Sequence, residues 1–214
     1  ATAAAARLAR RVTGREVILN AGYRGWPDTW SAGLAPGVPQ ALAASIERFA
    51  LGDHEPLEAL VMKHRGQVAA IAVDVSTEWP GDDYLPWLRD LCDEVGALLV
   101  FDEIVTGFRI AHGGAQEAYG VVPDLACYGK AISGGYPLAA IAGRADVMAV
   151  LDARSRPKAE VVWATNTLNG NPVCAAAGLV ALDVLGRPGT YERLARTGAR
   201  LREGLVAAGK RRGF

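Results

Sequence analysis

The chain alternates between apolar runs and amphipathic stretches for most of its length. The runs at residues 16–23, 67–75 and 97–104 are rich in Val, Ile, Leu and Ala, which is typical of strands covered on both faces of a sheet. Helical patterns at residues 55–64 and 84–96 separate these runs. Strands and helices that alternate in this way need crossover connections, so the pattern predicts an α/β fold with a mostly parallel sheet.

The second half of the chain continues the pattern with shorter runs. We expect strands at residues 125–131, 138–144 and 161–167, followed by a long helix at residues 172–186. Residues 24–40 are rich in Gly, Pro and Trp and too broken for a core element. They are expected to form a functional loop.

Helices are predicted at both ends of the chain, without the usual boundary residues. The first ends at Gly14 but has no capping Ser, Asp or Asn before it, and the last, from about Thr190, stops without a terminal signal. We therefore expect residues 1–188 to form an N-terminally truncated large domain. Residues 189–214 are expected to form a helix that leads into a missing C-terminal small domain.

Composition narrows the classes of partner. The chain has 23 Lys and Arg against 23 Asp and Glu, so no net field attracts nucleic acid or an anionic membrane surface, and small molecules are the expected partners. No apolar run approaches the roughly 18 residues of a membrane span. Cys92, Cys127 and Cys174 are odd in number and set among apolar residues, which favours reduced thiols and a cytoplasmic location. The histidines have no metal-ligand spacing and are expected at the surface: His54, His64 and His112.

Asp102 and Glu103 follow the apolar run GALLVF, and we expect them at the carboxyl end of a central strand, where open α/β sheets bind ligands. A buried carboxylate at that place needs a partner. On the residues alone, two interpretations stay open: a ligand site, or a pair of acids that leaves the sheet for solvent or caps the next turn. Glu103 is expected to be structural, paired with Arg109.

Lys130 lies in the run DLACYGKAISGGYPLAAIAG, where no acid occurs between Asp124 and Asp146. Its neighbours are apolar or glycine, which is not the pattern of a surface lysine. Because burial of an ammonium group is costly, such a lysine either extends its amine to an edge of the protein or has a lowered pKa and a covalent role. Gly134 and Gly135 either allow the backbone to approach a flat ligand closely or form an ordinary turn.

Several motifs in a fixed order carry a specific resemblance. GYRGWPDTW and GVPQAL are followed by LLVFDEIVTGFR, then by GGAQEAYGVVPDLACYGKAISGGYPLAAIAGR and TNTLNGNPVCAAAGLVAL. Together they resemble the aminotransferase class III family, most closely its glutamate-1-semialdehyde 2,1-aminomutase-like branch, over nearly the whole chain. The resemblance implies the large domain of fold type I pyridoxal-phosphate enzymes, an α/β domain with a mostly parallel, seven-stranded sheet and helices on both faces.

The resemblance also implies pyridoxal 5'-phosphate as cofactor and four residues around its ring. Lys130 would form the internal aldimine, and Asp102 would hold the protonated pyridine nitrogen. A carboxylate at that nitrogen keeps the ring cationic, and a cationic ring stabilises the carbanion formed when the substrate loses its α-proton. Lys130, once released, would move that proton between the substrate and the cofactor. Ile104 and Tyr23 match the side chains on the two ring faces.

Thr167, in the turn TNTLNGNP, resembles the family threonine that binds the cofactor phosphate across a subunit interface. The resemblance therefore implies a homodimer with shared active sites. From the residues alone, Thr167 serves equally well in turn formation or capping, and Asn171 is a rival N-cap for the helix that begins at Pro172.

The chain departs from the family pattern at several positions. Arg24 stands where the family has the histidine of a Tyr-His-Gly run, and Asp74 and Val75 stand where it has Glu-Pro. Ser133 and Ala139 occupy positions often taken by glycine. These departures leave the substrate open.

Secondary candidates have both a functional and a structural interpretation. Thr106 and Arg109 either touch the cofactor or substrate or form a structural ion pair or turn. Trp26 and Trp30 either line a substrate channel or pack within their loop.

The implied function is movement of an amino group. It is either transfer between a small-molecule amino donor and a keto or aldehyde acceptor, or migration within one substrate. The alternative is a catalytically inactive fragment or divergent homologue that retains the cofactor-binding fold. A nicotinamide-dependent dehydrogenase is set aside, because LNAGYRGW lacks the G-x-G-x-x-G fingerprint.

Overall fold

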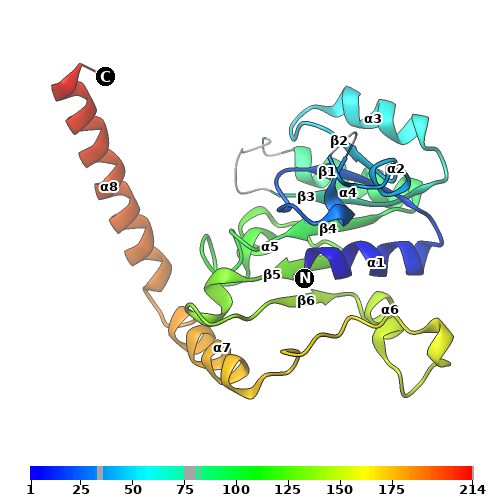
Figure 1. The fold of residues 1–214 in the computed structure, drawn as a ribbon. Helices are drawn as coiled ribbons and strands as arrows, with labels where there is room; N and C mark the ends of the chain where they lie inside the picture. Colours follow the sequence, from blue (N-terminus) through cyan, green and yellow to red (C-terminus); the bar gives the residue numbers. More distant parts are fainter. Residues whose placement is uncertain (33–35, 75–80, 82, 214) are drawn as a thin grey trace.

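A six-stranded sheet of order β2-β1-β3-β4-β5-β6 forms the centre of the molecule (Figure 1). The computed structural model describes residues 1–32, 36–74, 81 and 83–213. Neighbouring strands are parallel from β2 through to β5, and β6 is antiparallel to β5. The strands are β1 (Val17–Ala21), β2 (Ile46–Arg48), β3 (Val68–Val73), β4 (Leu98–Asp102), β5 (Leu125–Tyr128) and β6 (Ala140–Gly143).

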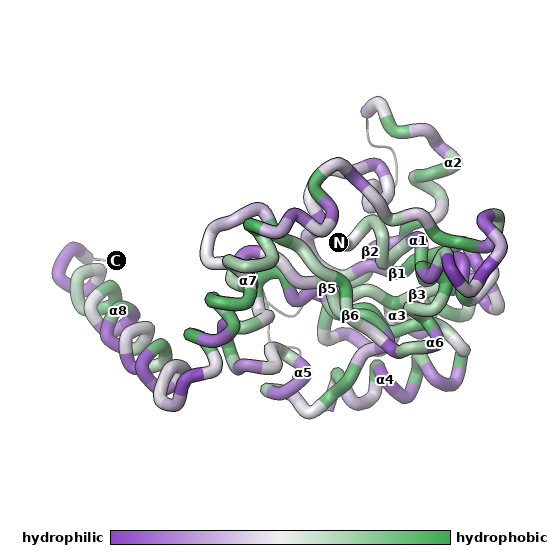
Figure 2. Tube along the Cα trace, turned by 90° about the horizontal axis from the view of Figure 1, so that it is seen from below, coloured by the Kyte–Doolittle hydropathy of each residue, from purple (hydrophilic) through white to green (hydrophobic). Residues whose placement is uncertain are grey.

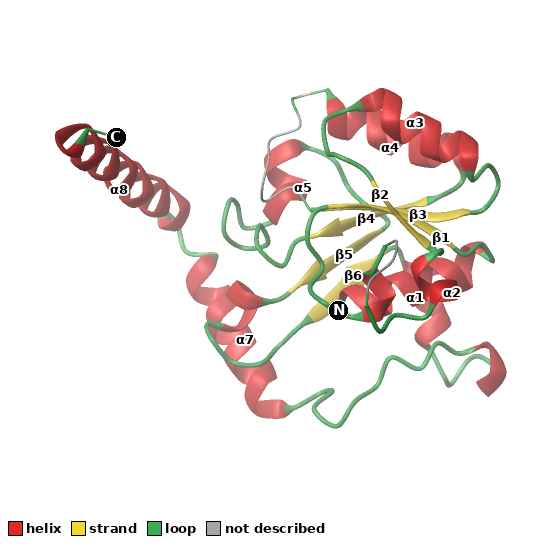
Figure 3. Cartoon of the chain, turned by 45° about the horizontal axis from the view of Figure 1, so that its top comes forward, coloured by secondary structure: helices red, strands yellow, loops and turns green. Residues whose placement is uncertain are grey.

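Helices cover both faces of the sheet (Figure 3). α1 contacts β3, β4 and β5 on one face, whereas α3 and α4 cover the other. α7 packs against η2, and α8 extends away from the sheet (Figure 1). The α-helices are α1 (Thr2–Thr13), α2 (Gln40–Ala43), α3 (His54–Lys63), α4 (Tyr84–Val95), α5 (Gly114–Tyr119), α6 (Ala145–Met148), α7 (Pro172–Leu185) and α8 (Thr190–Arg212). The 3₁₀ turns are η1 (Asp28–Trp30), η2 (Lys130–Ser133), η3 (Ala149–Leu151) and η4 (Lys158–Glu160).

Strand β3 shows how the two faces of the sheet are filled. Ala70 and Ala72 pack in one core cluster with Ala5 of α1. Ile71 and Val73 belong to the other cluster, with residues of α3 and α4. The small side chains on the first face allow α1 to lie close to the strands without leaving a void. All of β3 is buried, so the predicted sheet with two covered faces is confirmed.

Most predicted elements lie where the hydrophobic pattern placed them. The first helix ends at Gly14, which adopts a left-handed φ of 68° and donates its backbone N–H to the carbonyl oxygen of Arg10. The helices α3, α4 and α7 match the predicted ranges to within one residue at either end, and β1, β3 and β4 are shorter than the apolar runs that contain them. The predicted α/β class with a mostly parallel sheet is therefore confirmed.

The described residues form six strands, whereas the resemblance implies seven for the large domain. The run at 161–167 joins no sheet. Val162 donates its backbone N–H to the Val150 carbonyl oxygen at 2.9 Å, and the Trp163 carbonyl oxygen accepts from Arg7 at 3.5 Å. A turn and a side chain thus satisfy backbone groups that a neighbouring strand would otherwise pair.

The last two helices expose much apolar surface. Figure 2 shows hydrophobic residues along α7, and Val173, Leu179 and Val180 of this helix are 60%, 71% and 65% exposed. No single described helix is long and apolar enough to cross a membrane. Taken together, α7 and α8 have the length and composition of a membrane span, but the pair is bent by 80°.

The division into residues 1–188 and 189–214 stays a prediction.

Candidate functional site

The carboxyl ends of three neighbouring strands bring three charged side chains together. Ala21 of β1 pairs with Val73 of β3, so the residues that follow these strands meet at one edge of the sheet. The Nη1 atom of Arg24 lies 3.4 Å from Oδ2 of Asp102 and 3.9 Å from Oδ2 of Asp74. All three side chains are buried. Ligands of open α/β sheets bind at this edge.

Asp102 is the last residue of β4, and its carboxylate is held from two sides. Oδ1 accepts a hydrogen bond from the backbone N–H of Ile104 at 3.0 Å, and Oδ2 faces Arg24. Burial raises the pKa of Asp102, and the charge of Arg24 is the largest effect that opposes this rise. The charge of Lys130 also lowers the pKa of Asp102. A further cation beside Asp102 would stabilise its ionised form.

Lys130 begins η2, directly after β5, the strand next to β4. Its φ of 50° is left-handed, which is uncommon for a residue with a side chain and recurs at functional sites. The residue is exposed, as expected for an amine at an edge of the protein, and its covalent role stays a prediction. Ile132 and Ser133 of the same turn are buried, which accounts for the apolar neighbours of Lys130 in the sequence.

The two residues predicted to flank the cofactor ring have different environments. Ile104 is half-buried, and its Cγ2 atom would lie 3.5 Å from a Cβ added to Gly129. Ile104 therefore borders the turn that carries Lys130. Tyr23 follows β1 and is 76% exposed. In the part of the chain that the structure describes, no hydrogen bond joins the side chain of Tyr23 to Lys130 or Asp102.

Thr167 lies in an exposed turn before α7. Asn171, the other candidate cap, is confirmed as the N-cap of α7. Its Oδ1 accepts hydrogen bonds from the backbone N–H groups of Val173 at 3.0 Å and Cys174 at 3.2 Å. Among the described residues, the side chain of Thr167 makes no hydrogen bond. Its predicted phosphate role therefore stays a prediction.

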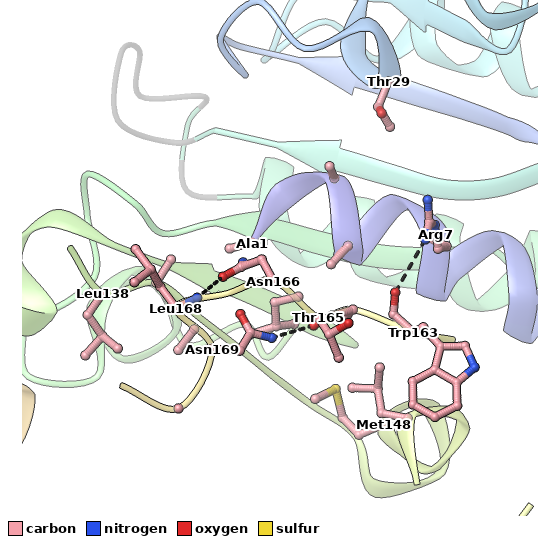
Figure 4. Close-up of a pocket in the computed structure, with 18 of the residues that line it drawn as sticks. Ala1, Arg7, Thr29, Leu138, Met148, Trp163, Thr165, Asn166, Leu168 and Asn169 are labelled. Atoms are coloured by element: carbon pink, nitrogen blue, oxygen red, sulfur yellow. Dashed lines mark hydrogen bonds between the residues drawn. The ribbon is translucent and has the colours of Figure 1, made fainter. Parts of the chain in front are cut away.

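A cavity of about 980 Å³ lies between α1 and the turn that contains Thr167 (Figure 4). In its wall, Arg7 donates to the Trp163 carbonyl oxygen, and Nδ2 of Asn169 donates to the carbonyl oxygen of Ala164 at 2.7 Å. Neither Asp102 nor Lys130 lines this cavity. It is therefore distinct from the charged cluster at the sheet edge, which carries the candidate chemistry.

The sequence profile of the aminotransferase class-III family matches residues 31–213. The chain belongs to the aminotransferase class-III family. Among its relatives is the glutamate-1-semialdehyde 2,1-aminomutase of Citrifermentans bemidjiense, 38% identical over 232 aligned residues that cover 100% of the chain and 53% of the relative. The chain thus spans about half the length of the curated relative it matches.

Solved transaminases share the fold of this class-III chain. An omega-transaminase from Sphaerobacter thermophilus superposes with a TM-score of 0.86 and 31% identity, covering 97% of this chain and 52% of that one. The FumI protein of Sphingopyxis sp. MTA144, solved in its PLP internal aldimine form, gives a TM-score of 0.86 and 29% identity, covering 100% of this chain and 51% of that one. The predicted family and fold type are confirmed.

Glu103 of this class-III chain is structural, as predicted, but its predicted partner is wrong. Its carboxylate is fully buried and accepts from Oγ1 of Thr106 at 2.6 Å and from the backbone N–H of Ala115 at 2.8 Å. Arg109 instead donates to the Val105 carbonyl oxygen at 2.8 Å. The structural interpretation of Thr106 and Arg109 is therefore supported, since both stabilise the loop after β4.

The remaining candidates occupy separate environments. Trp30 is buried below Arg24, with Cζ of Arg24 at 5.7 Å from the ring centroid, and Trp26 is 89% exposed. His64 is half-buried beside Glu47, so its predicted surface position holds only in part. The other two histidines, His54 and His112, are exposed, as predicted. Cys92, Cys127 and Cys174 are buried and free, also as predicted.

Two departures from the family pattern, Arg24 and Asp74, lie near Asp102. Val75 is outside the described residues. Ser133 is buried and donates its hydroxyl to the Tyr136 carbonyl oxygen. In the sequence Arg24 is recognisable only as a substitution, and its ion pairs were not predicted. The available signal was that charged residues follow three strands that neighbour one another in the sheet.

Proposed function

We propose that this chain is the cofactor-binding core of a pyridoxal-phosphate enzyme that moves an amino group. The observation that carries the proposal is the placement of a buried carboxylate, Asp102, and an exposed primary amine, Lys130, at the carboxyl ends of two adjacent parallel strands. Membership of the class-III family and the transaminase neighbours support it.

The described residues fit pyridoxal 5'-phosphate. Arg24, Asp74 and Asp102 together carry one negative charge in excess, which suits the protonated nitrogen of a pyridine ring. Lys130 supplies the primary amine that binds an aldehyde carbon with loss of water. When bound, the cofactor supplies the electron sink that stabilises negative charge on the substrate carbon.

Each residue has a distinct task in this proposal. Asp102 would keep the ring nitrogen protonated, and Ile104 and Tyr23 would flank the ring. Lys130 would hold the cofactor and, once released, would carry a proton to or from the substrate carbon as base and acid. These tasks follow the order of the elements: Tyr23 after β1, Asp102 and Ile104 after β4, and Lys130 after β5.

The proposed substrates are a small-molecule amino donor and a keto or aldehyde acceptor, or one substrate that contains both groups. The aminomutase relative favours migration within one molecule, and the omega-transaminase neighbour favours transfer between two. We place the protein in the cytoplasm, because Cys92, Cys127 and Cys174 are all buried and free.

The proposed assembly is a homodimer in which Thr167 binds the phosphate of the cofactor held by the other subunit. An apolar groove of about 700 Å³ runs along α7, lined by Tyr136, Val173, Val180 and their neighbours. Exposed apolar surface of this kind commonly marks an interface. The turn that carries Thr167 directly precedes α7 and offers a hydroxyl for an anion.

Reductive trapping tests the cofactor assignment. Natural full-length protein is incubated with pyridoxal 5'-phosphate, reduced with borohydride and mapped by peptide mass. We expect the added mass on Lys130, and none in a Lys130→Arg variant, which keeps the charge but lacks the primary amine. A cofactor on Lys63, Lys158 or Lys210 would contradict the assignment.

Turnover separates an active enzyme from the inactive alternative. If the protein is active, addition of amino donors to the loaded protein should change its visible absorbance, and keto or aldehyde acceptors should restore it. A cofactor trapped on Lys130 with no spectral response to any amine would identify a binding protein that retains the fold without the reaction.

A further inference from the structure

The charged side chain of Arg24 is almost completely buried. Its side chain is 2% exposed, and its charge lies over the ring of Trp30. Burial of a guanidinium group is costly unless the group is paired and hydrogen-bonded. Arg24 therefore needs charged or polar partners in its surroundings.

Backbone groups orient the guanidinium of Arg24. Nη2 donates to the Ala21 carbonyl oxygen at 3.0 Å, and Nη1 donates to the Tyr23 carbonyl oxygen at 3.1 Å. Gly22 makes this fold of the chain possible, because its φ is +96° and an added Cβ would lie 2.5 Å from Cβ of Asp74. The strand end is thus shaped around Arg24, and its side chain has one defined direction.

That direction leads to two carboxylates. Nη1 faces Oδ2 of Asp102 and Oδ2 of Asp74, which are buried on neighbouring strand ends. Burial raises the pKa of Asp102, and the neighbouring charge of Asp74 raises it further. The charge of Arg24 lowers the pKa of Asp102 and so opposes these two effects. Without Arg24, the N–H of Ile104 and the weaker effect of the Lys130 charge would remain to favour the ionised form.

We propose that Arg24 is a positioning residue that keeps Asp102 ionised and fixes its orientation toward the ring nitrogen of the cofactor. The inference rests on the proposed function, since it assigns the partner of the residue that would hold that nitrogen. Arg24 does not touch the cofactor in this role. It acts through Asp102, and each carboxylate oxygen retains a second acceptor direction for the ring N–H.

The test compares two ligands that differ at one ring atom. Cofactor-free, full-length protein is titrated with pyridoxal 5'-phosphate and with its 1-deaza analogue, in which C–H replaces the ring nitrogen. The ratio of the dissociation constant of the 1-deaza analogue to that of pyridoxal 5'-phosphate measures how strongly the protein recognises the ring nitrogen. A residue that only stabilises the strand ends affects both ligands equally and leaves this ratio unchanged.

We expect Arg24→Met and Arg24→Gln to lower the ratio about tenfold, because a hydrogen bond from the ring N–H to an oriented, charged carboxylate contributes roughly that factor to affinity. Arg24→Lys should retain most of the preference, since it keeps the charge but not the planar fork. Arg24→Gln retains donor groups for the backbone carbonyls, so it carries the test if Arg24→Met does not fold, as judged by circular dichroism.

Arg89→Met is the matched control. It removes one guanidinium from Asp124, another buried carboxylate of the sheet, which keeps Arg144 as a second partner at 2.7 Å. This change is expected to lower stability and leave the ligand ratio unchanged. A folded Arg24→Met or Arg24→Gln protein with the wild-type ratio would overturn the role of Arg24 alone. A wild-type protein with no preference for the ring nitrogen would instead overturn the role of Asp102 in the proposed function, and that of Arg24 with it.

Discussion

At the scale of single residues, Asp102 combines burial with charge, and these two properties oppose each other. Burial raises its pKa, and Arg24 and the N–H of Ile104 favour the ionised form. Such a carboxylate interacts strongly with any cation that reaches it, because water does not screen the contact. The surroundings therefore prepare Asp102 for a charged partner before that partner binds.

Replacement of Asp102 by Asn should leave the fold intact and remove most turnover. An amide cannot stabilise a protonated ring nitrogen, and loss of one such charge-assisted contact is worth about 2 to 4 kcal/mol in the transition state, or on the order of a hundredfold in rate. Steady-state kinetics on purified Asp102→Asn would measure the loss. Asp93→Asn, at an exposed ion pair of α4, is the control and should retain the wild-type rate. Normal turnover in a folded Asp102→Asn protein would contradict the proposal that Asp102 keeps the ring nitrogen protonated.

Two buried cysteines should be unreactive in the folded protein. Burial raises the pKa of Cys92 and raises that of Cys127 to about 12, so both stay as thiols at neutral pH. Because the thiolate is the reactive form, we expect an aromatic disulfide reagent at pH 8 to modify neither residue until denaturant is added. Mass spectrometry of the labelled peptides checks this. Rapid labelling of Cys127 under native conditions would show that β5 opens locally.

Residue chemistry was partly readable from the sequence. Asp102 was placed correctly because an apolar run ends at the carboxyl edge of a sheet, whatever the partners are. The exposure of Lys130 was not readable, since the same apolar neighbours occur around a buried lysine and around one that emerges at a turn. The predicted partner of Glu103 was wrong because the Thr106 hydroxyl and backbone N–H groups satisfy its carboxylate, and backbone donors leave no signature in the sequence.

At the scale of elements, the turn before α7 separates two side chains with different tasks. Asn171 caps α7, and Thr167 makes no described side-chain hydrogen bond. Asn171→Ala should lower the free energy of unfolding by about 1 kcal/mol, because two N–H groups at the helix start lose their acceptor. Urea denaturation would show the difference.

Thr167→Ala is the matched variant in the same turn. It should leave the stability of the cofactor-free protein nearly unchanged, since the cap is intact. If instead Thr167→Ala lowers stability as much as Asn171→Ala, then Thr167 serves the turn, and its phosphate role loses its support.

Long helices and buried strands were predictable because their periodicity extends over many residues. β2 was missed because it has three residues, too few for a pattern, and it forms only by pairing with β1. The run at 161–167 was wrongly predicted as a strand, because apolar content does not reveal whether a neighbouring backbone is available to pair. In both cases the deciding interaction is tertiary.

At the scale of the whole molecule, shared active sites would make two inactive proteins complement each other. Lys130→Ala lacks the cofactor amine, and Thr167→Ala is expected to lose phosphate affinity. In a mixed dimer one site would contain both native residues, so mixing should restore up to about a quarter of wild-type activity if subunits exchange at random. Activity assays after mixing, with differently tagged subunits to confirm exchange, give the measurement.

A monomeric protein with full activity would contradict the shared site, and so would exchanged dimers without recovered activity. Neither result bears on Asp102 or Lys130. The exposed apolar residues of α7 would then need another partner, such as a different part of the same polypeptide.

The order of strands also determines how the molecule can reach its folded state. Ala70 of β3 pairs with Leu98 across α4 alone, whereas Ile18 of β1 pairs with Ala70 only after the whole segment that contains β2 and α3 has been enclosed. Closing the longer segment costs more chain entropy, so β1 should join a core already formed by β3, β4 and β5. Pulsed hydrogen exchange during refolding should therefore protect the amides of β4 before those of β1, and the reverse order would contradict this route. On this route Arg24 reaches Asp102 last, and the charged cluster forms only when the sheet is complete.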